Sequence, residues 1–267
     1  MKRLRNHFSK FLLLATVLSV TSAMGQISAN YLIPGPTVGC GSLAVDFQDI
    51  STGNPTGWFW DFGNGLTSTD QNPLMLFNVG VYDVKLIVTD SVASDTIIYN
   101  NIIKVFANPE ANFTTDLTSG CLPLEVSFED LSLSSSPIVS WFWDFGDGGN
   151  NISSNPIYTF DEQGAYDISL LVMDSNQCSN LISYSNFIKT EDKPIIDFLA
   201  TPEFSCYSSQ QVYFQNNTQN SNLYNYEWDV GDGQISSFQN PSHLYSNQGV
   251  YNVKLKVFSS ICIDSVL

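Results

Sequence analysis

The sequence predicts an all-β protein made of three tandem β-sandwich domains. Three observations lead to this prediction: a long internal repeat, strands in which apolar and polar residues alternate, and no helical periodicity after the first 25 residues. Equivalent tryptophans in the repeats are separated by 83 and 85 residues. This period is too long for a solenoid unit and suits a small sandwich domain.

The clearest repeated segment is a tryptophan-containing strand that runs into a glycine-rich turn. It reads WFWDFGNG at 58–65, WFWDFGDG at 141–148 and YEWDVGDG at 226–233. Successive side chains point to opposite faces of the strand, as expected when one face is buried and the other is exposed to solvent. Glycine supplies the positive φ that tight turns need, so each segment predicts a strand followed by a turn.

A second repeated segment predicts a long late strand. It reads GVYDVKLIV at 80–88, GAYDISLLV at 164–172 and GVYNVKLKV at 249–257. In the third copy every second residue is apolar, with Asn252, Lys254 and Lys256 between. Each repeat also carries an Asn-Pro pair between the two segments, and proline does not join a central ladder. We therefore expect a turn at that point.

Together these segments resemble the PKD domain. The features that carry the resemblance are the W-D-F-G-D-G turn, the P-x-H-x-Y stretch at 241–245 and the G-x-Y-x-V-x-L-x-V strand. The resemblance implies seven-stranded, immunoglobulin-like sandwiches that serve outside cells as spacers or binding modules. Repeat 1 departs from the pattern at Asn64, and the first two repeats lack the histidine of P-x-H-x-Y.

We assign repeat 1 to residues 26–107, repeat 2 to 108–192 and repeat 3, which is incomplete, to 193–267. The linkers are short and contain Pro109 and Pro194, so the repeats are expected to form an extended string. Repeat 3 stops five residues after Cys262, whereas repeat 2 continues well past Cys178 into a final strand. Ending there would leave an open sheet edge. We therefore expect more of the chain after Leu267.

Residues 1–25 have the order of a secretory signal peptide: a basic start, a short apolar run, and small residues before a cleavage point between Gly25 and Gln26. The apolar run is too short to cross a bilayer, so no membrane insertion is predicted. The leader holds four of the ten basic residues and none of the 26 acidic ones. Six basic against 26 acidic residues leave the mature chain a net charge of −20, which excludes nucleic acid as a partner. A secreted or cell-surface protein is predicted.

Two sets of shared aromatic residues are expected to serve the fold. Large tryptophans dominate a small core, and a tyrosine at the start of the late strand resembles the tyrosine corner of immunoglobulin folds. The predicted core and corner residues are Trp60, Trp143, Trp228, Tyr82, Tyr166 and Tyr251. Phe59 and Phe142 point away from the tryptophan face. They either pack on a neighbouring strand or form an exposed contact.

The cysteines suit a secreted sandwich. Cys121 precedes an early strand and Cys178 follows the late one, and Cys206 and Cys262 hold the matching places in repeat 3. We predict the bridges Cys121–Cys178 and Cys206–Cys262. Cys40 has no such partner in its repeat, so it is expected to be an odd thiol, either buried and inert or available for an intermolecular bridge.

The glycine-rich turns carry carboxylates that are candidates for binding calcium, a hard cation that prefers oxygen ligands. They are Asp144, Asp147, Asp229 and Asp232. The alternative is that each carboxylate accepts hydrogen bonds from backbone N–H groups of its own turn. No other cofactor is predicted, and zinc is disfavoured because no metal-ligand spacing is present.

No catalytic motif is found. The sequence lacks the nucleophile elbow, the HExxH zinc motif, the P-loop and the dinucleotide fingerprint, and after cleavage it keeps one histidine, His243. We predict a non-catalytic extracellular module that mediates protein or surface contacts and acts as a spacer. Two alternatives are an accessory region of a larger secreted protease or polysaccharide hydrolase, and a glycan-binding module. The partner would be an extracellular protein or polysaccharide.

Overall fold

The computed structural model describes residues 26–267 and confirms the tandem β-sandwich prediction. The predicted signal peptide lies outside the described residues. The chain divides into two compact units, the first ending at Val105 and the second comprising Phe106–Leu267, and each is considered by itself. The described part contains one short 3-10 helix, η1 (Ser221–Leu223), and no helix in it is long and apolar enough to span a membrane.

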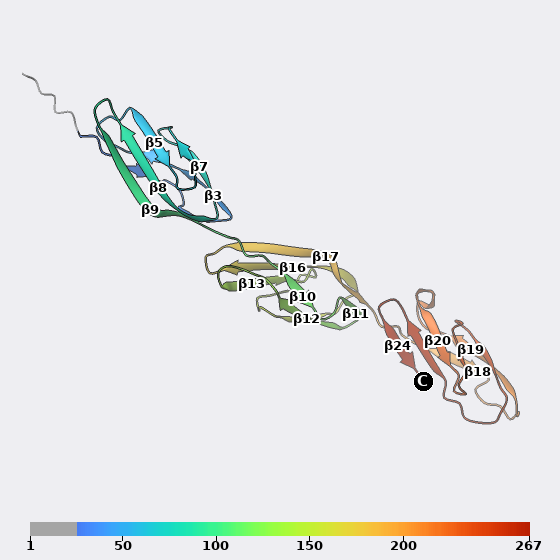
Figure 1. Ribbon diagram of the computed structural model, residues 1–267. Coiled ribbons are helices and arrows are strands. Elements are labelled where there is room, and N and C mark those ends of the chain that lie inside the picture. Colours follow the sequence, from blue (N-terminus) through green and yellow to red (C-terminus); the bar gives the residue numbers. More distant parts are fainter. Residues whose placement is uncertain (1–25) are drawn as a thin grey trace, which may run out of the picture. The chain divides into compact units, whose positions relative to one another are not determined.

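Repeat 1 is built on a five-stranded sheet with the order β2-β9-β8-β5-β6, which is faced by the pairs β1-β4 and β3-β7 (Figure 1). Its two longest strands, β8 and β9, are antiparallel neighbours with a register shift between Tyr82 and Val84. The strands are β1 (Tyr31–Leu32), β2 (Val38–Cys40), β3 (Ser42–Asp46), β4 (Gln48–Asp49), β5 (Gly57–Asp61), β6 (Thr67–Ser68), β7 (Leu74–Asn78), β8 (Gly80–Thr89) and β9 (Ser94–Phe106).

Repeat 2 has the same plan, with a five-stranded sheet β11-β17-β16-β13-β14 and a three-stranded sheet β10-β12-β15. The first strand of the larger sheet, β11, runs parallel to the end of β17, while the other pairings are antiparallel. The strands are β10 (Phe113–Thr115), β11 (Ser119–Cys121), β12 (Leu124–Asp130), β13 (Ile138–Asp144), β14 (Asn150–Asn151), β15 (Ile157–Phe160), β16 (Gly164–Asp174) and β17 (Ser179–Glu191).

Repeat 3 keeps the three-stranded sheet, β18-β19-β22, but its larger sheet has four strands in the order β21-β20-β23-β24. Two of these are much shorter than their counterparts in repeat 2, because β23 and β24 have 5 and 4 residues while β16 and β17 have 11 and 13. The strands are β18 (Phe198–Thr201), β19 (Gln210–Asn216), β20 (Asn225–Asp229), β21 (Ile235–Ser236), β22 (Ser242–Tyr245), β23 (Lys254–Phe258) and β24 (Ile263–Val266).

Each repeat has a hydrophobic core of its own between its sheets. At the centre of each lies the tryptophan of the first repeated segment, surrounded by alternate residues of the long late strand. This arrangement follows from the period-two pattern, since every second side chain of a strand points to the same face. Polar side chains in between face solvent.

The disulfide pairing corrects the sequence prediction. Cys121 is bonded to Cys262, so it does not pair with Cys178, and Cys206 is an exposed free thiol that does not pair with Cys262. Cys40, expected to be odd, is disulfide-bonded, as is Cys178. The bridge Cys121–Cys262 links repeat 2 to repeat 3, with the two Cα atoms 5.1 Å apart.

The physical reason lies in the length of β17. Cys178 immediately precedes this strand, whereas Cys121 pairs with Glu191 at its other end. Thirteen extended residues cover about 40 Å, so the two cysteines of repeat 2 lie at opposite ends of the sandwich. Cys262 instead lies beside Glu191, its sulfur 3.4 Å from the Glu191 carbonyl oxygen. The sequence showed correctly that Cys121 precedes β12 and that Cys178 follows β16, but not which end of the sandwich each cysteine occupies.

Candidate functional site

The shared tryptophans and tyrosines lie where the fold needs them. The tryptophans are completely buried, and each indole N–H donates to a backbone carbonyl ten residues later, over 2.9–3.0 Å. The tyrosine hydroxyls donate to carbonyls three or four residues upstream. Buried polar groups of aromatic side chains normally find such partners. These residues are Trp60, Trp143, Trp228, Tyr82, Tyr166 and Tyr251.

The turn carboxylates accept hydrogen bonds from their own turns. Asp144 accepts from the Gly146 N–H at 2.9 Å, and Asp147 accepts from the Gly149 N–H at 2.8 Å. Gly146 has a φ of +79°, and an added Cβ would lie 2.5 Å from the Asp167 carbonyl oxygen, so glycine is required there. Carboxylates engaged in this way organise the turn.

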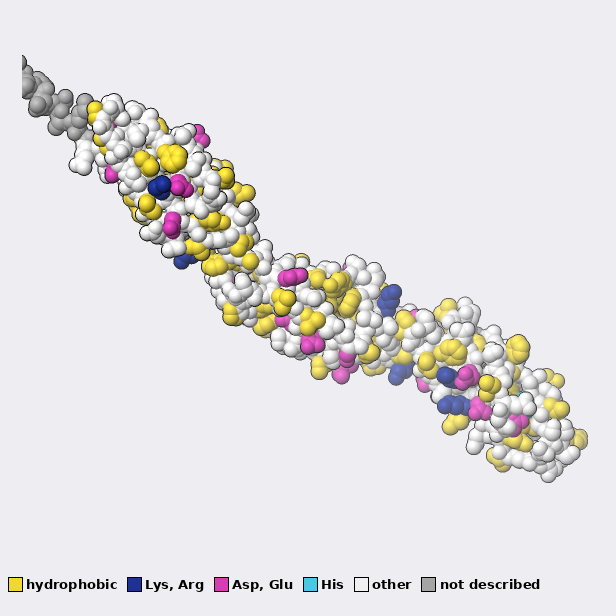
Figure 2. Space-filling model, in the orientation of Figure 1, with side chains coloured by type: hydrophobic (Ala, Val, Ile, Leu, Met, Phe, Trp, Pro, Cys, Tyr) yellow, Lys and Arg dark blue, Asp and Glu magenta, His cyan; other side chains and the backbone are white. Residues whose placement is uncertain are grey.

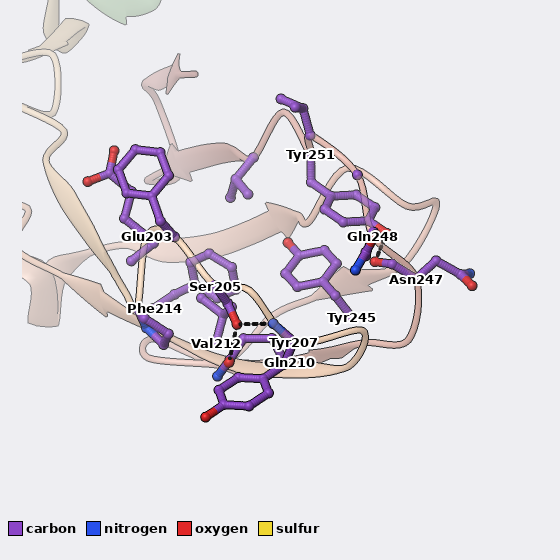
Figure 3. A pocket seen from close by; sticks show the side chains of 16 residues that line it. Glu203, Ser205, Tyr207, Gln210, Val212, Phe214, Tyr245, Asn247, Gln248 and Tyr251 are labelled. Atoms are coloured by element: carbon purple, nitrogen blue, oxygen red, sulfur yellow. Dashed lines mark hydrogen bonds between the residues drawn. The ribbon is translucent and has the colours of Figure 1, made fainter.

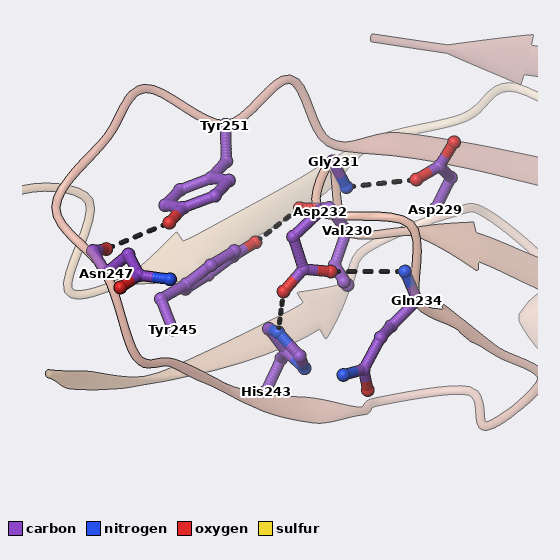
Figure 4. A network of polar contacts seen from close by, with 9 residues as sticks. All are labelled: Asp229, Val230, Gly231, Asp232, Gln234, His243, Tyr245, Asn247 and Tyr251. Atoms are coloured by element: carbon purple, nitrogen blue, oxygen red, sulfur yellow. Dashed lines mark hydrogen bonds and ion pairs between the residues drawn. The ribbon is translucent and has the colours of Figure 1, made fainter.

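Repeat 3 shows the same caps. Asp229 accepts from the Gly231 N–H at 2.9 Å, and Asp232 accepts from the Gln234 N–H at 3.1 Å (Figure 4). Among residues 26–267, no group of three or more histidine, cysteine, aspartate or glutamate side chains is placed to hold a metal ion. The candidate calcium ligands are therefore not brought together into one cluster.

A side-chain pair that sequence reasoning missed ties the turn to the opposite sheet in repeats 2 and 3. In repeat 3, Asp232 lies 2.7 Å from His243 Nε2, and in repeat 2 the equivalent Tyr158 hydroxyl donates to Asp147 at 2.8 Å. This pair explains both departures of repeat 1 from the sequence pattern. There the aspartate is Asn64, and Met75 stands where the histidine and tyrosine stand in the other repeats. The two positions change together, a signal that could have revealed the contact.

The Asp232–His243 pair affects the pKa values of side chains in and near its turn. Burial raises the pKa of Asp232, but the hydrogen bonds from His243 and the Gln234 N–H outweigh it, and the net pKa is lowered. Close by, the Tyr245 hydroxyl donates to the Val230 carbonyl at 2.7 Å, and burial together with the negative charge of Asp232 raises the pKa of Tyr245 to about 12 (Figure 4).

A lowered aspartate pKa predicts a pH-dependent stability. Since folding favours the charged form, the stabilisation is present above the ordinary aspartate pKa and is lost as the pH falls through the lowered value. We expect His243→Met, which installs the repeat 1 residue, to weaken this dependence in repeat 3. The pH dependence is measured by thermal melts of both proteins between about pH 6 and pH 2, a range that includes the ordinary aspartate pKa. Parallel melting curves for the two proteins across this range would contradict the prediction.

Phe142 lies on the outer face of the larger sheet of repeat 2, with 44 % of its surface exposed. It is directly opposite Leu171 on β16, and Leu171 is opposite Leu181 on β17. All three are exposed, so they form an apolar row across three strands, which we call the outer row. Side chains opposite each other in a sheet lie within contact distance. The leucines were missed, although Leu170-Leu171-Val172 interrupts the alternation of its strand.

The corresponding rows of the other repeats differ in chemistry. Repeat 1 has Phe59, which is 40 % exposed, opposite Ile87 and then Thr96. Repeat 3 has an ion pair at these positions, Glu227 with Lys256 at 3.7 Å, and then Ser265. On the face shown in Figure 2, hydrophobic side chains lie among a largely uncharged surface. The outer row is therefore the candidate contact surface.

Comparison with known proteins identifies the domains. A family model described as the PKD domain matches residues 37–100, 106–187 and 191–260, one segment for each repeat. The chain belongs to the PKD family. The three PKD domains follow the sequence resemblance closely, including their immunoglobulin-like sandwich form.

Individual relatives cover small parts of the chain. Collagenase ColQ1 of Bacillus cereus (strain Q1) is 43 % identical over 37 residues, which are 14 % of this chain and 4 % of the collagenase. The PKD1 domain of the Vibrio cholerae metalloprotease PrtV is 28 % identical and that of Vibrio anguillarum Epp is 26 % identical. Each alignment covers 32 % of this chain, and 98 % and 99 % of the two solved domains, with TM-scores of 0.28 and 0.29. The chain thus spans 4 % of the length of the collagenase, and each solved PKD1 domain corresponds to about one third of this chain.

Proposed function

We propose that this chain is a non-catalytic extracellular module that mediates protein or surface contacts and spaces other parts of its protein. The observation that carries the proposal is the outer row, an apolar strip across the sheet of repeat 2 that the core does not use. Exposed apolar side chains gathered in one place are typical of interaction surfaces. The partner would be an extracellular protein or polysaccharide.

Several features support a location outside the cell. The leader pattern at residues 1–25 and the acidic composition suit secretion. The disulfide Cys121–Cys262 suits an oxidising compartment, since such bridges are rare in the cytosol. Among the described residues, Asp144, Asp229 and His243 form hydrogen bonds that hold the turns, which is a structural role.

The outer row gives a direct test. The purified chain is screened for binding to immobilised extracellular matrix proteins and to a glycan array, as wild type and as the double variant Phe142→Ser, Leu171→Ser. We expect the variant to lose at least about tenfold in affinity for whichever surface the wild type binds, since central apolar contacts carry most binding energy.

Repeat 3 supplies the matched control for this test. Glu227 and Lys256 occupy the same two sheet positions, so the double variant Glu227→Ser, Lys256→Ser alters an equivalent area without removing apolar contacts. We expect it to bind as the wild type does. Equal loss in both variants, or no binding by the wild type to any protein or glycan, would contradict the proposal.

A second proposal is that these domains are the accessory region of a secreted protease. It is favoured by the match to collagenase ColQ1 and by the PKD1 domain of a metalloprotease. In that case the gene beyond the Leu267 codon encodes a catalytic domain. Further PKD repeats leading to a secretion or anchoring domain would instead support the contact and spacer function.

A further inference from the structure

The strand β7 of repeat 1 lies at an edge of its sheet. It pairs with β3 on one side, and no described strand pairs with its other side. Its register with β3 runs from Leu74 opposite Asp46 to Asn78 opposite Ser42. An edge strand presents a row of unpaired backbone N–H and C=O groups, to which a strand of another chain can bond.

The hydrogen bonds to β3 decide which residues of β7 present these groups. The Phe47 N–H donates to the Pro73 carbonyl at 2.9 Å, so these two opposite residues are joined by a ladder bond. In an antiparallel ladder, hydrogen-bonded and non-hydrogen-bonded pairs alternate. The odd-numbered residues of β7 therefore bond to β3, and Leu74, Leu76 and Asn78 direct their backbone groups to the open edge.

The side chains on this edge are apolar and uncharged. Leu74 and Leu76 are 65 % and 58 % exposed. Residues 71–82 contain no charged side chain. Native edge strands often carry charged side chains that discourage pairing with another chain. Because β7 carries none, no charge on the strand itself opposes the approach of a second strand.

The equivalent edge strand of repeat 2 is more polar. β15 carries isoleucine and threonine at the two leucine positions, and two acidic residues follow it directly, at 161–162. Negative charge beside an edge strand disfavours its pairing with another copy of itself.

The equivalent edge strand of repeat 3, β22, carries Ser242 and Leu244 at the two leucine positions. Its last residue, Tyr245, borders a groove of about 650 Å³ (Figure 3). The core residues Val212 and Phe214 also line this groove, so it lies on the inner side of the sheet and not along the outer edge of β22. Among the described repeats, only repeat 1 presents two leucines on this edge.

We propose that β7 pairs antiparallel with β7 of a second copy of this chain, about a two-fold axis at Leu76. In this register Leu76 lies opposite the second copy's Leu76, and Leu74 lies opposite the second copy's Asn78. Every residue that directs its backbone groups outward then meets another such residue, so donors face acceptors. The Asn78 carbonyl also accepts from the Tyr82 hydroxyl at 3.1 Å, and its second lone pair serves the new ladder.

Two observations favour a second copy as the partner. In this register the strand is complementary to itself, as two-fold interfaces between identical subunits require. The chain is also strongly acidic, so two copies repel each other over most of their surfaces, whereas the uncharged β7 edge opposes no like charges. Because only one described repeat has such an edge, the pair closes on itself and does not grow into a fibre.

Engineered cysteines test the register. All variants carry Cys206→Ser, which removes the exposed free thiol. Leu76→Cys then places two thiols opposite each other, with the Cα atoms about 5.5 Å apart, within the range of a disulfide. We expect the oxidant diamide to produce a covalent dimer on a non-reducing gel. Leu74→Cys is the matched control, because its Cα atoms lie about 13 Å apart in the pair.

The control separates specific pairing from chance collision. We expect Leu74→Cys alone to give at least about tenfold less covalent dimer, since cysteines beyond about 7 Å cannot be bridged without backbone movement. A mixture of Leu74→Cys and Asn78→Cys chains should cross-link. Equal cross-linking of the two single variants at 74 and 76, or no cross-linking of Leu76→Cys, would overturn the proposal.

Sedimentation equilibrium measures the pair without engineered thiols. We expect Leu76→Lys to weaken self-association at least about tenfold, because like charges then lie directly opposite each other. Leu244→Lys makes the same change at the equivalent position of β22 and should leave self-association unchanged. A wild-type chain that stays monomeric, a dimer that persists in Leu76→Lys, or an equal effect of the two lysines would each contradict pairing through β7.

Discussion

Replacing Trp143 by alanine is expected to lower the free energy of unfolding of repeat 2 by about 3–5 kcal/mol. Trp143 is completely buried and packs edge-on against Phe113, with the ring centroids 5.2 Å apart. The substitution removes about 200 Å² of buried apolar surface and leaves a cavity. The free energy of unfolding of an ordinary domain is about 5–15 kcal/mol, so the substitution would remove a large part of it.

Urea denaturation of the chain, with hydrogen exchange at the amides of β16 as the probe of unfolding, measures this loss of stability. The neighbouring Phe142 is the matched control, because it lies on the same strand and points outward. We expect Phe142→Ser to cost less than about 1 kcal/mol, the usual range for an exposed sheet pair. Equal destabilisation by the two substitutions would mean that the core does not depend on the tryptophan.

Removal of the Cys121–Cys262 bridge is expected to cost about 2–5 kcal/mol. The two residues are 141 apart in sequence, and the entropy that a cross-link removes from the unfolded chain grows with the length of the closed loop. The double variant Cys121→Ser, Cys262→Ser removes the bridge without leaving a new thiol. Its thermal midpoint should fall well below that of the wild type in a calorimetric melt of repeats 2 and 3.

Cys206→Ser is the control for this experiment, since Cys206 is an exposed free thiol and its loss should leave the midpoint unchanged. Peptide mapping without reduction tests the pairing itself. A fragment that joins the Cys121 peptide to the Cys262 peptide is expected. A fragment that joins Cys121 to Cys178 would show that the bridge lies within repeat 2.

Much of the fold could be predicted because the chain contains three copies of the same domain, and the copies can be compared with one another. Trp60, Trp143 and Trp228 occupy the same position in the three copies, since a small core needs a large side chain to fill it. The tyrosine corner and the glycine turns follow from local geometry, in which a hydroxyl or a positive φ is required within a few residues. Such short-range demands are readable from one sequence.

The rest depended on distances that a sequence does not contain. The bridge partners could not be chosen, because which end of β17 lies near Cys121 is decided by the parallel pairing of β11. The Asp147–Tyr158 contact joins a turn to the other sheet, and the outer row joins three strands. The turn carboxylates accept hydrogen bonds from backbone N–H groups of their own turns, which is one of the two interpretations that the sequence left open.

The Cys121–Cys262 bridge has a mechanical consequence. A force that stretches the polypeptide cannot separate Cys121 from Cys262 beyond the length of the bridge. The residues between these two cysteines include Trp143 and Trp228, so unfolding of either core adds no length between Cys121 and Cys262 while the bridge is intact. Reduction would release about 500 Å of extensible chain. In this part of the molecule, the redox state therefore sets how far the chain yields under load.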